Sequence, residues 1–159
     1  MSAKLHSAEA RQAVLLAGLL QALFALFGFW FIGIPIAAFF SVAFYKRRVI
    51  GASLNPGLGA RLGLISGAIG FVIFALLGSA EILLSHTAGG LREEVMKQLE
   101  EIAAQYPAQA QQALAYLRSA EGWGFIVAMS TIFTLLAFLL LSTIGGGLAG
   151  GILGRKDRR

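Results

Sequence analysis

GARLGLISGAIGFVIFALL, residues 59 to 77, is the stretch that decides the fold of this chain. Arg61 is its only charged residue, and the apolar pattern runs on to residue 84, so a helix here is long enough to cross a bilayer. Its glycines recur at helical spacing and place small residues on one face: Gly59, Gly63 and Gly67, with Gly70 close behind. Such a face lets another helix backbone approach closely.

A second glycine run, GGGLAGGILG, occupies residues 145 to 154 and carries its own strip at spacing four, made of Gly146, Gly150 and Gly154. The run lacks the GxxxxGK pattern of a phosphate-binding loop. We expect the two strips to pack against each other as an antiparallel helix pair, which explains the glycines without a ligand. The alternative use of these faces is contact with a second copy of the chain or with a larger complex.

The composition indicates a membrane protein. Of the 159 residues, 57% are hydrophobic and 13% are charged, and the mean hydropathy is +0.76. Soluble domains have about 25% charged residues, and a chain this short has too little interior to bury so much apolar surface. We therefore expect a single membrane domain of all-α class, residues 1–159. The chain has no cysteine, which excludes disulfides, zinc–thiolate sites and a cysteine nucleophile.

The apolar runs predict a polytopic membrane protein with a four-helix transmembrane bundle. Residues 12 to 45 carry no charge and would be about 50 Å long as one helix, against a hydrocarbon core of about 30 Å. One steeply tilted helix remains open, but a turn near Gly33–Pro35 makes two helices the favoured interpretation. The predicted spans are residues 12–31, 35–50, 60–84 and 123–150.

Residues 89–121 form the extended polar segment of the sequence, and we predict an extramembrane amphipathic helical hairpin there. Leu91, Val95 and Leu99 recur at spacing four and share one helix face, while glutamates occupy much of the rest. Pro107 is expected to break the helix. The apolar face of this segment either covers the protein's own bundle or docks a partner.

The charges predict the topology, because Lys and Arg collect on the cytoplasmic side of membrane proteins. Four spans with both termini in the cytoplasm place ten of the thirteen Lys and Arg residues on that side: Lys4, Arg11, Lys46, Arg47, Arg48, Arg61, Arg155, Lys156, Arg158 and Arg159. Trp30 and Trp123 then fall at the outer boundary, as interfacial aromatic residues do. We expect a multi-pass protein of the bacterial inner membrane, with the lipid bilayer as its surroundings and no nucleic-acid partner.

Few residues at membrane depth carry chemistry. Gln21 lies near the middle of the first predicted span, where an interhelical hydrogen bond is the ordinary role and a transport site is the alternative. Glu81 lies near the outer end of the third span, and His86 follows closely enough to pair with it. These three residues are the candidate polar or ion site. No third ligand accompanies Glu81 and His86, so we expect no metal and no cofactor.

The layout resembles a group of small bacterial four-span membrane proteins of the DUF4199-like and glycine-rich acidobacterial type. The shared features are a leading pair of apolar segments, a basic stop at residues 45–48, a GARLG-type third span, an amphipathic segment with Met, Glu and Gln, and a last span that ends in glycines and basic residues. The resemblance covers most of the chain. It implies a four-span membrane protein and carries no catalytic residues.

Together these features favour a non-enzymatic integral membrane protein. We expect an accessory or scaffold subunit that packs through its glycine-rich helices against itself or a larger membrane complex. The alternative is a small oligomeric channel or transporter that uses Gln21 and Glu81 in a polar path. A membrane enzyme is disfavoured, because two histidines and one carboxylate near the membrane are too few for an acid–base pair.

Overall fold

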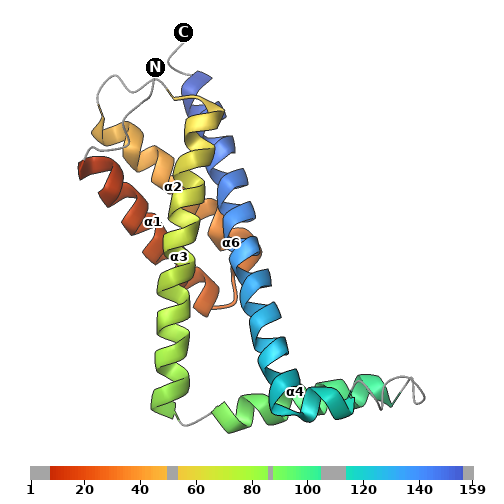
Figure 1. The fold of residues 1–159 in the computed structure, drawn as a ribbon. Coiled ribbons are helices and arrows are strands. Elements are labelled where there is room, and N and C mark those ends of the chain that lie inside the picture. The colour runs from red at the N-terminus through yellow and green to blue at the C-terminus, as the bar shows by residue number, and fades with distance from the viewer. Residues whose placement is uncertain (1–7, 50–53, 86–87, 105–113, 156–159) are drawn as a thin grey trace. The chain divides into compact units, whose positions relative to one another are not determined.

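The computed structural model describes residues 8–49, 54–85, 88–104 and 114–155, and these ranges contain helices and turns but no strand. The prediction of an all-α chain is therefore confirmed for the described residues. The helices in chain order are α1 (Ala8–Leu26), α2 (Trp30–Arg48), α3 (Pro56–Ser85), α4 (Ala88–Ala103) and α6 (Ala120–Arg155) (Figure 1). Residues 114–118 add a short helical stretch before α6.

The chain divides into two compact units, and α3 and α6 contribute to both. The first, here called the bundle unit, consists of residues 1–77 and 134–159 and contains α1, α2, the first part of α3 and the last part of α6. The second, here called the α4 unit, consists of residues 78–133 and contains α4 and the remaining parts of α3 and α6.

The turn between α1 and α2 lies at residues 27–29, so the turn predicted near Gly33–Pro35 is wrong. Gly28 has a φ of 80°, which glycine adopts without strain. The Gly28 N–H donates to the Ala25 carbonyl at 3.1 Å, and the Phe29 N–H donates to the Phe24 carbonyl at 2.9 Å. This is the Schellman pattern that ends a helix at a glycine. Pro35 lies inside α2 instead.

The long helices α3 and α6 both begin at a polar cap. The Asn55 side-chain oxygen accepts a hydrogen bond from the Leu58 N–H at 2.7 Å, and Pro56 follows as the first residue of α3. The Ser119 hydroxyl accepts one from the Gly122 N–H at 3.0 Å just before α6. Asn55–Pro56 therefore starts a helix. Both α3 and α6 begin a few residues before the starts predicted for their spans, which were residues 60 and 123.

Two helices within the described residues are long and apolar enough to cross a membrane. They are the Pro56–Ala80 part of α3, with 25 residues, and α6, with 36 residues. The apolar helix Ala10–Leu26 falls below that length. Of the predicted hairpin at residues 89–121, the structure has α4 and residues 114–118 as helices, while Pro107 lies outside the described residues.

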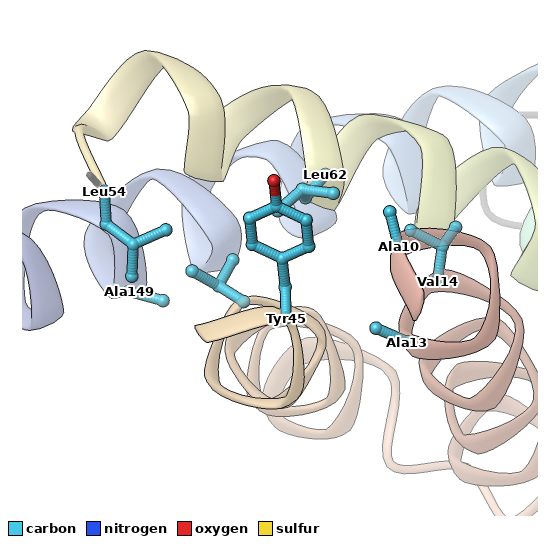
Figure 2. Close-up of a cluster of buried hydrophobic side chains, with 8 residues drawn as sticks. Ala10, Ala13, Val14, Tyr45, Leu54, Leu62 and Ala149 are labelled. Carbon is cyan, nitrogen blue, oxygen red and sulfur yellow. The ribbon is translucent and has the colours of Figure 1, made fainter. Parts of the chain in front are cut away.

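Small residues make up much of the interior of the bundle unit. Figure 2 shows one buried cluster, in which the Tyr45 ring of α2 lies beside Leu62 of α3, with Ala149 of α6 and three small side chains of α1 around it. A second cluster contains Ala25, Ile34 and Phe138. Most buried apolar side chains are alanines, while large side chains such as Phe31, which is 83% exposed, point outward.

Candidate functional site

The predicted glycine strip of α3 lies directly against α6. A Cβ added at Gly59 would lie 2.9 Å from Gly150 Cα, and one at Gly63 would lie 3.2 Å from Gly146 Cα. A Cβ at Gly67 would lie 2.8 Å from the Phe138 carbonyl oxygen. Later residues of α3 meet earlier residues of α6, so the two helices are antiparallel. Their backbones touch where a side chain would separate them.

The reciprocal strip on α6 distinguishes neighbouring glycines. A Cβ at Gly146 would lie 2.9 Å from Gly63 Cα, one at Gly150 2.5 Å from the Asn55 carbonyl oxygen, and one at Gly154 3.0 Å from the Leu54 carbonyl carbon. The adjacent Gly147 and Gly151 have room, because their nearest described atoms would be 3.8 Å and 3.6 Å from such a Cβ.

Gly70 belongs to a different interface. A Cβ there would lie 2.7 Å from Gln21 Oε1 and 3.1 Å from the Gly18 carbonyl oxygen, so Gly70 packs on α1 rather than on α6. Gly145 packs on α2 in a similar way, since its Cβ would lie 2.7 Å from Pro35 Cα. Neither Gly18 nor Gly145 was among the predicted packing residues.

Gln21 is the centre of a buried polar cluster between three helices. Its amide nitrogen donates to the Ser66 hydroxyl on α3 at 3.1 Å, and its amide oxygen accepts from the Ser142 hydroxyl on α6 at 3.2 Å. Ser66 in turn donates to the Gly63 carbonyl at 2.9 Å. All three side chains have no exposed surface. The cluster therefore ties α1, α3 and α6 together at the level of the glycine strips.

Sequence reasoning singled out Gln21 but missed both serines as its partners. A signal for each was present, because Ser66 immediately precedes Gly67 and Ser142 lies four residues before Gly146, in line with the α6 strip. Small hydroxyl residues are common at close helix contacts because they combine little volume with a hydrogen bond. Spacing alone does not show which helix supplies the partner.

The other two candidate polar residues are Glu81 and His86. Glu81 falls within α3, but its side chain lies outside the described part of the structure, and His86 lies outside it altogether. The predicted pairing of Glu81 with His86 therefore stays a prediction. Among the described residues, no group of three or more His, Asp or Glu side chains could hold a metal ion.

One end of the bundle unit gathers basic residues. The Lys46 ammonium group donates to the Leu153 carbonyl at 2.8 Å, which joins the ends of α2 and α6. Arg48 donates to the Gln12 side-chain oxygen at 2.5 Å, which joins the end of α2 to the start of α1. Cations in the last turn of a helix, as in α2, also interact favourably with the helix dipole. The basic residues of this end, here called the basic end, are Arg11, Lys46, Arg47, Arg48, Arg61 and Arg155.

The two tryptophans lie in different units and both have aromatic or cationic neighbours. The Trp30 ring makes edge contacts with Phe74 of α3 and Phe138 of α6, at centroid distances of 5.2 Å and 6.0 Å. In the α4 unit, the Arg92 guanidinium lies 5.8 Å from the centre of the Trp123 ring. Trp30 is half-buried against these rings at the start of α2, and its predicted position at the outer membrane boundary stays a prediction.

Arginine side chains link the elements of the α4 unit. Arg92 donates to the Arg118 carbonyl at 2.6 Å, and Arg118 forms an ion pair of 2.5 Å with Glu100. Gly122 allows residues 114–118 to pack on α6, since a Cβ there would lie 2.7 Å from Leu117 Cα. The ion pair is solvent-exposed and contributes little stability by itself.

No protein-family model, curated protein or solved structure matches the chain. The resemblance to DUF4199-like and acidobacterial membrane proteins therefore stays a prediction.

Proposed function

We propose that the chain is an integral membrane protein whose bundle unit lies within a bilayer. The observation that carries this proposal is the inverted distribution of side chains. Soluble proteins bury most of their large apolar residues, whereas alanines make up most of the buried apolar side chains of this unit, together with buried serines and one glutamine. Phe138, Ile34 and Leu62 are the largest side chains that it buries. Lipid solvates large apolar side chains well, and membrane helices pack through small residues. Large exposed side chains surround the unit, among them Leu15, Leu19, Phe31, Phe40, Leu64, Leu76, Leu140 and Leu148.

All four helices of the bundle unit are proposed to cross the membrane. α1 and α2 have 19 residues each, which is about 28 Å at the helical rise, close to the thickness of the hydrocarbon core. Phe29 offers no side-chain cap to α2, so the N–H groups of the first turn of α2 need water or headgroups as partners. This favours a turn at Gly28 that reaches the membrane surface opposite the basic end.

The proposed orientation places the basic end in the cytoplasm. Positively charged residues are retained on that side during insertion, and the basic end contains six of them in the described part of the bundle unit. Both termini then lie in the cytoplasm, and the bacterial inner membrane is the proposed location.

We propose a non-enzymatic role as an accessory or scaffold subunit. The buried amide and hydroxyl groups of Gln21, Ser66 and Ser142 bond to one another, so the chemistry at the centre of the unit serves helix packing. The glycine strips of α3 and α6 contact each other within the chain. A second copy or a larger membrane complex would therefore contact the exposed Leu and Phe side chains rather than the glycines.

A mass measurement on the protein extracted from native membranes tests this role. The chain has a mass of 16.8 kDa, so a scaffold extracted in a mild detergent is expected as a particle of at least twice that protein mass. Transfer to a strong detergent should reduce it to the single chain, which serves as the control. A single chain without any bound partner in the mild detergent would contradict the role. Release by an alkaline carbonate wash would contradict the membrane location itself.

A further inference from the structure

An apolar groove runs between α1 and α3 and has an arginine in its wall. Its volume is about 250 Å³, and its lining residues are Ala10, Arg11, Val14, Leu15, Ile65 and Ile69. Further along, the two helices come close together at Gly18 and Gly70, where a Cβ on Gly18 would lie 3.1 Å from the Gly70 nitrogen. Leu15 and Ile65 are both exposed, so the groove opens toward the surroundings of the helices.

Two arginines stand at the basic end of this groove. Arg11 belongs to its wall, and Arg61 lies one helical turn before Ile65, on the same face of α3. Both side chains are exposed, and within the described ranges neither makes a hydrogen bond or ion pair. Lys46 and Arg48, by contrast, bind Leu153 and Gln12. Arg11 and Arg61 are thus free to bind an anion beside an apolar groove.

We propose that this groove is a binding site for an anionic phospholipid. One acyl chain lies along Val14, Leu15 and Ile65, and the phosphate is held by Arg11 and Arg61. We choose an anionic lipid because its charge complements the two arginines, and guanidinium groups bind phosphate oxygens through paired hydrogen bonds. Basic pockets on the cytoplasmic side of membrane proteins also lie at the depth of the headgroups. The proposal rests on the membrane location of the bundle unit.

Native mass spectrometry of the full chain in a neutral detergent tests the site. Palmitoyl-oleoyl phosphatidylglycerol is titrated against palmitoyl-oleoyl phosphatidylcholine, which has the same acyl chains, and inorganic phosphate is titrated alone. We expect one molecule of phosphatidylglycerol to bind per chain, about tenfold more tightly than phosphatidylcholine. Charge-assisted hydrogen bonds to the headgroup account for a difference of this size. Inorganic phosphate alone should not bind measurably, because the groove contributes the remaining affinity.

Matched arginine variants separate a site from a general basic surface. Arg11→Gln and Arg61→Gln are each expected to weaken phosphatidylglycerol binding about tenfold. Arg155→Gln removes the same charge at the same end on α6, away from the groove, and should change binding less than about twofold. Ile65→Trp fills the groove and should weaken the binding of both lipids. The thermal midpoint of each variant without lipid reports folding.

Three results would overturn the proposal. Equal losses at Arg11, Arg61 and Arg155 would show diffuse attraction by the basic end. Equal affinity for the two lipids would show that the arginines do not recognise the headgroup. Tight binding of phosphate alone would show that the groove does not contribute to binding. A protein that resists a carbonate wash but shows any of these results retains its membrane location and lacks only the lipid site. Release by the wash would remove the basis of both proposals.

Discussion

Replacing Gly146 by alanine is expected to destabilise the bundle unit by about 1–3 kcal/mol, whereas the same change at Gly147 should alter stability by less than about 0.5 kcal/mol. The two residues are neighbours on α6, so helix propensity, depth and chain context are matched. A Cβ at Gly146 would lie 2.9 Å from Gly63 Cα, which is backbone and cannot rotate away. A Cβ at Gly147 would gain an ordinary contact 3.8 Å from Ala60 Cβ.

The free energy of unfolding in mixed micelles, measured by titration with a denaturing detergent, checks this pair. Gly63→Ala on α3 should repeat the loss seen for Gly146→Ala, because it tests the same contact from the other helix. Gly18 is a poor control, since a Cβ there would lie 3.1 Å from the Gly70 nitrogen. Equal stability of the Gly146→Ala and Gly147→Ala proteins would mean that α3 and α6 do not pack through this strip.

Replacing Gln21 by leucine is expected to cost about 1–3 kcal/mol, because two interhelical hydrogen bonds are lost and the Ser142 hydroxyl is left buried without its acceptor. Gln21→Leu combined with Ser142→Ala should cost less than the sum of the single changes. The coupling energy expected for one such bond within a membrane is about 0.6–1.7 kcal/mol.

The same variant discriminates between packing and transport. A packing role predicts that Gln21→Leu lowers the free energy of unfolding and that liposomes containing the wild-type chain show no more ion flux than empty ones. A channel or transporter that uses Gln21 and Glu81 predicts flux that the substitution removes. Flux lost in Gln21→Leu at unchanged stability would contradict the packing role and revive the transport alternative.

The small-residue faces could be derived from sequence because they depend on helical spacing alone. Gly59, Gly63 and Gly67 repeat at four residues, and any helix through them has a small face. The choice between Gly146 and Gly147 also follows from spacing, since Gly146 continues to Gly150 and Gly154. Gly70 shows the limit of prediction from spacing, because this small residue, just beyond the strip, packs against α1 and not against α6.

The turn and the polar partners depend on tertiary structure and were harder to predict. Pro35 is a stronger local break than Gly28 by sequence rules, yet the chain turns at Gly28, where a positive φ ends α1. A proline near the start of a helix interrupts few hydrogen bonds, and Pro35 instead packs against Gly145 of α6. The partners of Gln21 come from two helices distant in sequence, which no local pattern specifies.

Cysteine accessibility tests the proposed four-span topology most directly. The chain contains no cysteine, so a single Phe29→Cys at the turn or Arg47→Cys at the basic end reports its own position. In spheroplasts treated with a membrane-impermeant maleimide, Phe29→Cys should be labelled at once and Arg47→Cys only after the membrane is permeabilised. Labelling of Arg47→Cys in sealed spheroplasts, or a Phe29→Cys protein that stays unlabelled after permeabilisation, would contradict the account.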